Sequence, residues 1–211
     1  MPDTTRIFLC RHASPENPEG VFYGHLPGFG LSSQGRRQAL GLGSFLSAYP
    51  IRRIYASPLE RATETAELAA SRLSPPPPIE VREDLVETAW GRYIQGVPRP
   101  QAPFRRPLFF VHMVAPGWLP ADEKVAAMAE RIGRVCAEAV ASCRGEAAAL
   151  ISHSDPIKAF WNGFLDRPDW RFHMLPLPKG GLIELEYSGD TLAAFTPHQP
   201  IVDDAVVATE A

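Results

Sequence analysis

The chain has 211 residues, of which 45% are hydrophobic and 21% charged, and its formal net charge is −3. These values are typical of an ordinary globular domain with a substantial core, and the weak negative charge argues against nucleic acid or an anionic membrane as partner. No apolar run approaches the roughly 20 residues of a membrane span, and the N-terminus has no apolar leader segment. Three cysteines do not make a disulfide framework, so we expect a cytoplasmic protein.

The first predicted element is a short strand at residues 7–10, IFLC. Its apolar residues do not alternate with polar ones, which indicates a strand buried on both faces. The strand ends in Arg11 and His12, and a loop rich in proline and glycine follows over residues 14–31. Ser32 or Ser33 can then cap a helix that extends to about residue 49.

A second strand is predicted at residues 51–56, followed by the segment SPLERATETAELAASRL. Ser57 has the features of a helix N-cap, Pro58 fits the first helical position, and Glu60 completes a capping box. This places Arg61 in the first turn of a helix that follows directly after a strand.

The middle of the chain is rich in proline. Prolines at 75–78 end the second helix, and residues 79–81 can form a short strand. Residues 98–120 combine many prolines with several aromatic side chains. Proline resists regular structure, but so many aromatic residues are unusual for a solvated linker. We therefore predict an irregular but folded insert at about 91–120 that covers the domain as a lid.

Residues 121–143 have the periodicity of a long amphipathic helix. A third buried strand is predicted at residues 147–152 and is followed directly by His153. Asp155 before Pro156 can cap another helix, to about residue 164. Residues 180–197 then resemble a hairpin, and the tail at 201–211 is predicted to be frayed.

Strands that alternate with helices predict a single α/β domain over residues 1–211. We expect a three-layer sandwich, with a mostly parallel central sheet and helices on both faces. The carboxyl ends of parallel strands meet at one edge of a sheet, where ligands bind. Four charged or imidazole residues follow or end predicted strands: Arg11, His12, Arg61 and His153. We therefore expect them to meet in one pocket.

Two arginines and two histidines in one pocket predict an anion site. Arginine matches phosphate oxygens in a bidentate geometry, and the N-terminus of a helix adds partial positive charge. A neutral imidazole can attack phosphorus, while neighbouring cations stabilise the transition state. A carboxylic acid must then protonate the leaving alkoxide. Glu87 is the first candidate for this acid, with Glu83 and Asp84 as alternatives.

The segments RIFLCRHAS, YASPLERATETA and ALISHSDPIKAF, in this order, resemble the motifs of the histidine phosphatase superfamily, also called the phosphoglycerate mutase-like family. The resemblance implies the fold of that family and chemistry without a metal or a nucleotide cofactor. It implies His12 as the phosphorylated nucleophile and Glu87 as the proton donor, with His153 beside them. The residues that it implies for phosphate binding are Arg11, Arg61, His153, Asn17 and Ser154.

Two positions depart from the family pattern. Ala13 stands where the family usually has glycine, and we expect its methyl group to be tolerated. Ser154 and Asp155 replace a common pair of glycines. An acidic side chain is unfavourable beside phosphate, so we expect Asp155 to act as a helix cap that points away from the site.

These features predict a phosphomonoester hydrolase that acts on a small phosphorylated metabolite through a phosphohistidine. One alternative is a phosphoglycerate mutase-type transferase, which needs a water-poor site and a bisphosphate primer. Another is a catalytically silent protein that binds phosphorylated ligands, which the two departures favour. A metal site is disfavoured because the histidines lack local ligand spacing. The sequence leaves the substrate open, and a sheet edge or the insert could pair subunits in a homodimer.

Overall fold

The computed structural model describes residues 4–88, 91–119 and 122–199, so the tail predicted to be frayed lies outside the described residues. A six-stranded sheet forms its centre, with the strand order β3-β2-β4-β1-β5-β6. The first four of these strands are parallel, and the last two are antiparallel additions at one edge. The prediction of a mostly parallel sheet is confirmed. The strands are β1 (Thr4–Arg11), β2 (Ile51–Ala56), β3 (Ile79–Val81), β4 (Ala147–Ser152), β5 (Leu182–Ser188) and β6 (Thr191–His198).

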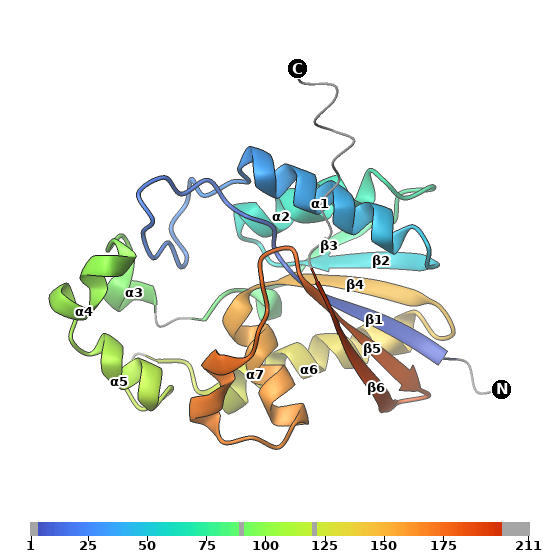
Figure 1. Cartoon of the computed structure of the whole chain (residues 1–211). Helices are drawn as coiled ribbons and strands as arrows, with labels where there is room; N and C mark the ends of the chain where they lie inside the picture. Colours follow the sequence, from blue (N-terminus) through green and yellow to red (C-terminus); the bar gives the residue numbers. More distant parts are fainter. Residues whose placement is uncertain (1–3, 89–90, 120–121, 200–211) are drawn as a thin grey trace.

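Helices cover both faces of the sheet, as predicted (Figure 1). On one face lie α1 (Ser33–Leu46) and α2 (Glu60–Ala70), and on the other lie α6 (Val125–Ser142) and α7 (Ser154–Phe164). Strand β1 contributes to two separate apolar clusters, one on each side of the sheet. Phe8 and Cys10 belong to the cluster under α1 and α2, whereas Ile7 and Leu9 belong to the cluster under α6. This explains why the apolar run in β1 does not alternate with polar residues.

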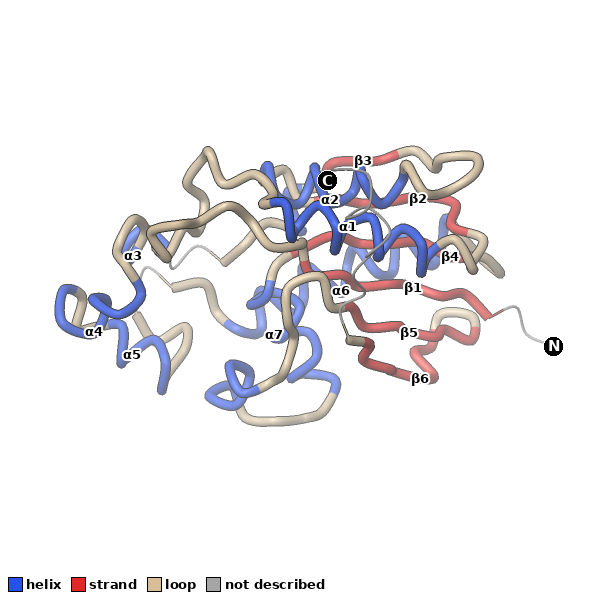
Figure 2. The backbone as a smooth tube through the Cα atoms, turned by 45° about the horizontal axis from the view of Figure 1, so that its top comes forward, coloured by secondary structure: helices blue, strands red, loops and turns tan. Residues whose placement is uncertain are grey.

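The register of the parallel strands aligns the residues that follow them. Arg11 of β1 pairs with Ser152 of β4, and Ala56 of β2 pairs with Ile151 of β4. The backbone N–H of His12 donates to the carbonyl of Ser152 at 2.9 Å. Strands β1, β2 and β4 therefore end at the same level, where the loops gather in Figure 2.

Two of the predicted helix caps are wrong. Helix α2 begins at Glu60 with Leu59 at the N-cap, because the backbone N–H of Ser57 still pairs with the carbonyl of Ile151 and so belongs to the end of the strand. Helix α7 begins at Ser154, which places Asp155 in its first turn and not at the cap. By contrast, Ser32 caps α1 as predicted, since its Oγ accepts the N–H of Gly35 at 3.1 Å.

The proline-rich segment is more regular than we predicted. Its short helices extend beyond the carboxyl end of the sheet (Figures 1 and 2). Proline occupies the first turn of two of them, where it has no hydrogen bond to break. The segments are α3 (Gly91–Ile94), a 3-10 turn (Arg99–Gln101), α4 (Ala102–Arg105) and α5 (Phe109–Val114). Two further 3-10 turns elsewhere in the chain span Glu83–Leu85 and Asp169–Met174.

The loop over residues 14–31 is fixed by side chains of α2. Glu60 accepts the backbone N–H of Gly28 at 3.0 Å, and Glu64 accepts that of Leu31 at 2.8 Å. The loop is thus held beside the end of β1. Among the described residues, no helix is both long and apolar enough to cross a bilayer.

The start of α1 rests directly on the backbone that follows His12. A Cβ atom at Gly35 would collide with the carbonyl oxygen of Ser14. We therefore expect Gly35→Ala to lower the free energy of unfolding by about 1–3 kcal/mol, measured by urea denaturation.

Gly133 in α6 provides the matched control, because a Cβ there would meet only a ring carbon of Phe160 at 3.7 Å. Gly133→Ala should stabilise the protein by up to about 1 kcal/mol through helix propensity. If both variants were equally stable, the close packing of α1 against Ser14 would be wrong.

Candidate active site

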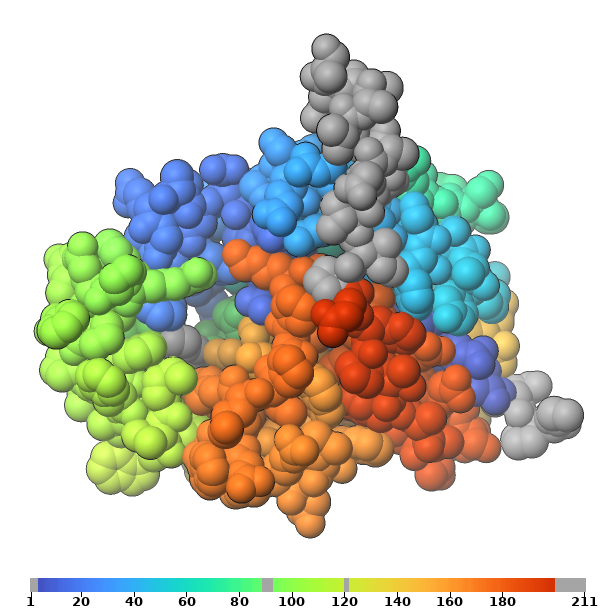
Figure 3. Space-filling view, in the orientation of Figure 1, coloured from blue at the N-terminus to red at the C-terminus, as the bar shows by residue number. Residues whose placement is uncertain are grey.

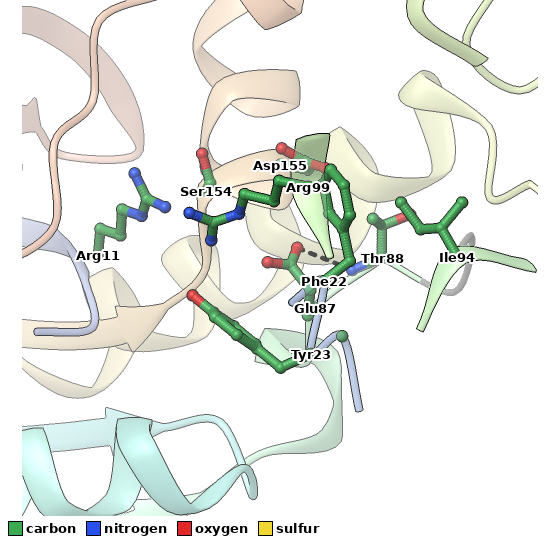
Figure 4. Close-up of a pocket in the computed structure, with 10 residues that line it drawn as sticks. Arg11, Phe22, Tyr23, Glu87, Thr88, Ile94, Arg99, Ser154 and Asp155 are labelled. Carbon is green, nitrogen blue, oxygen red and sulfur yellow. Dashed lines mark hydrogen bonds between the residues drawn. The ribbon is translucent and has the colours of Figure 1, made fainter. Parts of the chain in front are cut away.

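A pocket of about 160 Å³ opens at the edge of the sheet where β1, β2 and β4 end. Its walls come from the 14–31 loop, the segment around Glu87, the proline-rich insert and the start of α7 (Figure 4). The surface is hollowed between the green insert and the orange part of the chain (Figure 3). The lining residues are Arg11, Phe22, Tyr23, Gly24, Glu87, Thr88, Ile94, Arg99, Ser154 and Asp155.

Arg61 lies beside this pocket, between the two predicted histidines. Its Nε donates to Nε2 of His12 at 3.3 Å, and its Nη2 donates to Nδ1 of His153 at 3.2 Å. Nη2 also donates to the carbonyl of Gly24 at 2.9 Å, and the Tyr23 ring centroid lies 4.7 Å from Cζ. Only 1% of the Arg61 side chain is exposed. Sequence reasoning placed Arg61 in the first turn of α2, and the structure confirms that position.

The hydrogen bonds of His12 define its tautomer. Nδ1 lies 2.7 Å from the carbonyl oxygen of Ala13. A carbonyl oxygen can only accept, so Nδ1 carries the proton and Nε2 keeps its lone pair. Burial, followed by the positive charges of Arg61 and Arg11, holds the pKa of His12 well below its usual value. His12 is therefore a neutral imidazole at neutral pH, and the lone pair on its Nε2 accepts the hydrogen bond from Arg61.

His153 is neutral for the same reasons and is fixed in orientation by Ser57. Burial and the charge of Arg61 hold the pKa of His153 well below its usual value. Because Nδ1 accepts from Arg61, Nε2 carries the proton and donates to the hydroxyl of Ser57 at 2.7 Å. The two imidazole centroids are 5.0 Å apart. Among the described residues, no group of three or more His, Cys, Asp or Glu side chains is placed to hold a metal ion.

Arg11 and the start of α7 provide further donors at the pocket. Nη1 of Arg11 donates to the carbonyl of Leu177 at 2.6 Å, whereas its buried Nε has no hydrogen-bond partner among the described residues. Ser154 lines the pocket at the first position of α7, where backbone N–H groups are free of intrahelical partners. An anion in the pocket can accept hydrogen bonds from these groups.

Glu87 is the acidic candidate that lines the pocket. Its Oε1 accepts the backbone N–H of Thr88 at 3.0 Å. Burial and the nearby charge of Asp155 raise the pKa of Glu87 to about 7, against the opposing effect of Arg61. Of the two alternatives, Asp84 forms an ion pair with Arg134 at 2.8 Å, and Glu83 is exposed in the preceding 3-10 turn.

Asp155 does not point away from the site, contrary to our expectation. It lines the pocket together with Glu87 (Figure 4). The physical reason is the start of α7: with His153 at the N-cap, Asp155 falls in the first turn and faces the pocket. The other departure, Ala13, is buried, its N–H donates to Thr65 Oγ1 at 3.1 Å, and its φ is not positive. Its methyl group is therefore tolerated, as we expected.

Asn17 lies outside the pocket lining. Its side-chain amide donates to the carbonyl of Val21 and accepts the N–H of Val21, both at 3.0 Å. It thus closes a turn within the 14–31 loop. His25, in the same loop, donates from Nε2 to the backbone carbonyl of Glu87 at 2.7 Å, which ties the loop to the segment of the candidate acid.

Sequence reasoning missed three residues at this site. Ser57 was predicted as a helix cap but orients His153. Thr65 accepts the N–H of Ala13 and donates to the carbonyl of Arg61, so one hydroxyl links β1 to α2. Lys179 has its Nζ 6.0 Å from the Tyr23 ring centroid. Thr65 follows Arg61 by one helical turn, which is the one signal that could have indicated it.

Comparison with known families identifies the chain. The model of the histidine phosphatase superfamily (branch 1) matches residues 7–196, and the chain belongs to this superfamily. An uncharacterised protein of Mycobacterium tuberculosis, Rv0525, is 42% identical over 89 residues, which cover 42% of this chain and 43% of that protein. The bifunctional protein Rv2228c of the same organism is 28% identical over 192 residues, which cover 88% and 51%. The chain thus spans about half the length or less of these curated relatives.

Solved structures confirm the predicted phosphoglycerate mutase-like fold. YhfR of Bacillus stearothermophilus has a TM-score of 0.79 at 24% identity, over 90% of this chain and 95% of that one. A mycobacterial glucosyl-3-phosphoglycerate phosphatase has a TM-score of 0.77 at 23% identity, over 94% and 99%. A phosphoserine phosphatase of Entamoeba histolytica has a TM-score of 0.74 at 20% identity, over 92% and 98%. At these identities the similarity establishes the fold.

The proximity of the two pocket carboxylates can be tested by titration. Asp155→Asn removes a negative charge that disfavours ionisation of Glu87, so the pKa of Glu87 should fall from about 7. The measurement is the pH dependence of the Glu87 carboxyl ¹³C shift. Asp84→Asn is the control, because Asp84 pairs with Arg134 outside the pocket lining. An unchanged midpoint in Asp155→Asn would contradict the shared pocket.

Proposed function

We propose that this chain hydrolyses phosphomonoesters through a phosphohistidine intermediate at His12. The observation that carries the proposal is the locked tautomer of His12, whose Nδ1 donates to Ala13 and whose Nε2 faces Arg61. A nucleophilic nitrogen in a cationic, buried setting is what attack on a phosphate monoester requires. The phosphatases that share this fold support a phosphatase in preference to a transferase.

In the first step, Arg61 Nε turns from His12 Nε2 to a phosphoryl oxygen. The lone pair of Nε2 then attacks phosphorus, and the bond from phosphorus to the alcohol oxygen breaks. Arg11, Arg61 and the N–H groups at Ser154 stabilise the charge on the phosphoryl oxygens. Glu87 gives its proton to the departing oxygen, so the alcohol leaves neutral. A pKa of about 7 leaves a large fraction of Glu87 protonated at neutral pH.

In the second step, water attacks the phosphohistidine and the bond from phosphorus to Nε2 breaks. The Glu87 carboxylate accepts the proton of the water, and His12 regains its lone pair. His153 keeps Arg61 in position through the 3.2 Å hydrogen bond and remains neutral. In this scheme Asn17 acts only by shaping the loop above the site.

The substrate that we propose is a small phosphorylated metabolite. A cavity of about 160 Å³ is smaller than the roughly 300–1,000 Å³ of typical pockets for drug-sized ligands. The insert around Arg99 forms one wall of this cavity. We propose that it acts as the lid predicted from its composition.

His12→Ala should abolish the hydrolysis of para-nitrophenyl phosphate in EDTA, because it removes the nucleophile. His198→Ala is the matched control, since His198 lies at the end of the edge strand β6 and pairs with Glu184 of β5. Brief incubation of the wild type with ³²P-labelled substrate, followed by alkaline denaturation, should leave acid-labile label on the protein.

The other outcomes distinguish the alternatives. Activity only after addition of a bisphosphate primer would indicate a mutase, and phosphate binding without turnover would indicate a silent binder. Activity that EDTA abolishes and added metal restores would overturn the histidine nucleophile.

Glu87→Gln should slow the hydrolysis of alkyl phosphates by roughly 100-fold or more, because their alkoxides need a proton to leave. Para-nitrophenolate leaves without help, so its release should slow by less than about 10-fold. For the wild type, kcat/KM on alkyl phosphates should decline as the pH rises through about 7, where Glu87 ionises. Equal losses on both substrates would assign the acid role to another residue.

A further inference from the structure

Helix α5 in the proline-rich insert buries a histidine and exposes apolar side chains. His112 is buried and pairs through Nδ1 with Asp122 at 2.9 Å. Phe110, Met113 and Val114 are three and four residues apart, so they lie on one face of α5, and all three are exposed. A surface helix normally buries its apolar face and exposes its polar one. In α5 this arrangement is reversed.

The exposed face of α5 continues onto the 3-10 turn that follows α7. Val114, Trp118 and Trp170 line one shallow groove of about 330 Å³. Val114 is 71% exposed and Trp118 is 75% exposed. Asp169 also lines this groove, and Arg171 adds a positive charge on the same turn, with its Cζ 4.9 Å from the Trp170 ring centroid.

These exposed side chains form a surface that is separate from the candidate pocket. We call it the apolar surface, and its residues are Phe110, Met113, Val114, Trp118 and Trp170. Among the described residues that line the candidate pocket, none belongs to this surface. The insert projects beyond the carboxyl end of the sheet as the green lobe of Figure 3. Large apolar side chains that are exposed together on a projecting segment indicate a docking site.

The charge of the insert indicates what docks there. The net charge of −3 for the whole chain argues against an anionic membrane, but this charge is unevenly distributed. Residues 91–119 contain four arginines and no aspartate, glutamate or lysine. Arg105 is exposed and bonds to the neutral side chain of Gln101 at 3.1 Å. Arg106 is exposed and bonds to the carbonyl of Tyr93 at 2.8 Å. Their charges are therefore available to an anionic partner.

We propose that the apolar surface and the arginines of the insert bind the surface of a bilayer that contains anionic lipids. Aromatic and aliphatic side chains pack at the boundary between headgroups and acyl chains, and arginines there attract the lipid phosphates. A second copy of the chain fits this surface less well. Two inserts placed face to face bring Arg105 and Arg106 against their own counterparts, and like charges repel.

The test is sedimentation of the protein with two kinds of vesicle. One contains phosphatidylcholine alone, and in the other about 30% of the lipid is phosphatidylglycerol. At low ionic strength the wild type should bind the anionic vesicles roughly 10-fold or more tightly than the neutral ones, because several arginines contribute. The preference should diminish at high salt, which screens the charges. The measurement requires no turnover, so it is independent of the proposed hydrolysis.

Two double variants separate the apolar and the electrostatic contributions. Val114→Ser combined with Trp118→Ser should weaken binding to the anionic vesicles by about 10-fold or more, because less apolar area leaves water. Arg105→Gln combined with Arg106→Gln should reduce the preference for anionic over neutral vesicles by about 10-fold. All four side chains are exposed, so both variants should unfold at the same urea concentration as the wild type.

The matched controls are Val81→Ser and Arg36→Gln. They replace an exposed valine of β3 and an exposed arginine of α1, outside the insert, and should bind both kinds of vesicle as the wild type does. Absence of binding by the wild type, or equal binding to the two kinds of vesicle, would overturn the inference. A dimer that ignores vesicles and is lost in the Val114→Ser, Trp118→Ser variant would also overturn it, and would assign the apolar surface to a second copy of the chain.

Discussion

The buried guanidinium of Arg61 is the group on which the rest of the site depends. It is a full positive charge with 1% exposure, and its hydrogen-bond partners are two imidazoles and a backbone carbonyl. A buried charge without a counter-ion costs several kcal/mol, so the surrounding fold must hold it in place. The aligned ends of β1, β2 and β4 do so, because they position the imidazoles and the start of α2 at one level. In the proposed mechanism, a phosphate dianion that enters the pocket supplies the missing negative charge.

Burial and the neighbouring charges together set the protonation states of the groups around Arg61. Burial and nearby cations keep His12 and His153 neutral, while burial and Asp155 raise the pKa of Glu87 to about 7. The proposed nucleophile, which must be unprotonated, and the proposed acid, which must be protonated, can therefore coexist at one pH. Asp155 contributes by opposing the arginines, which would otherwise favour the ionised form of Glu87.

The parts of the chain around the pocket divide into two groups. Residues at the strand ends are held by backbone pairing of the sheet and by Thr65 and Ser57, which belong to the core of the domain. The 14–31 loop lies outside the sheet and is held by side-chain bonds, such as that of Glu64 to Leu31 and that of His25 to the Glu87 carbonyl. In the proposed function, a scaffold of this kind fixes the groups that act on phosphate, and the outer segments contact the rest of the substrate. The position of Arg99 on the insert is consistent with that division.

The sequence by itself determined the α/β class and closely predicted the bounds of five of the six strands. It also predicted that Arg11, His12, Arg61 and His153 converge on one edge of the sheet. These follow from local hydrophobic patterns and from the general geometry of parallel sheets. Only the tertiary structure decided that Ser57 orients His153 and that Asp155 lines the same pocket as Glu87. It also decided that Lys179 lies beside the Tyr23 ring. Each of these is a contact between segments distant in the chain, and local pattern carries no signal for it. Capping rules in particular failed at Ser57 and Asp155. Ser57 still pairs with β4, and α7 begins one residue before Asp155, with His153 at its N-cap.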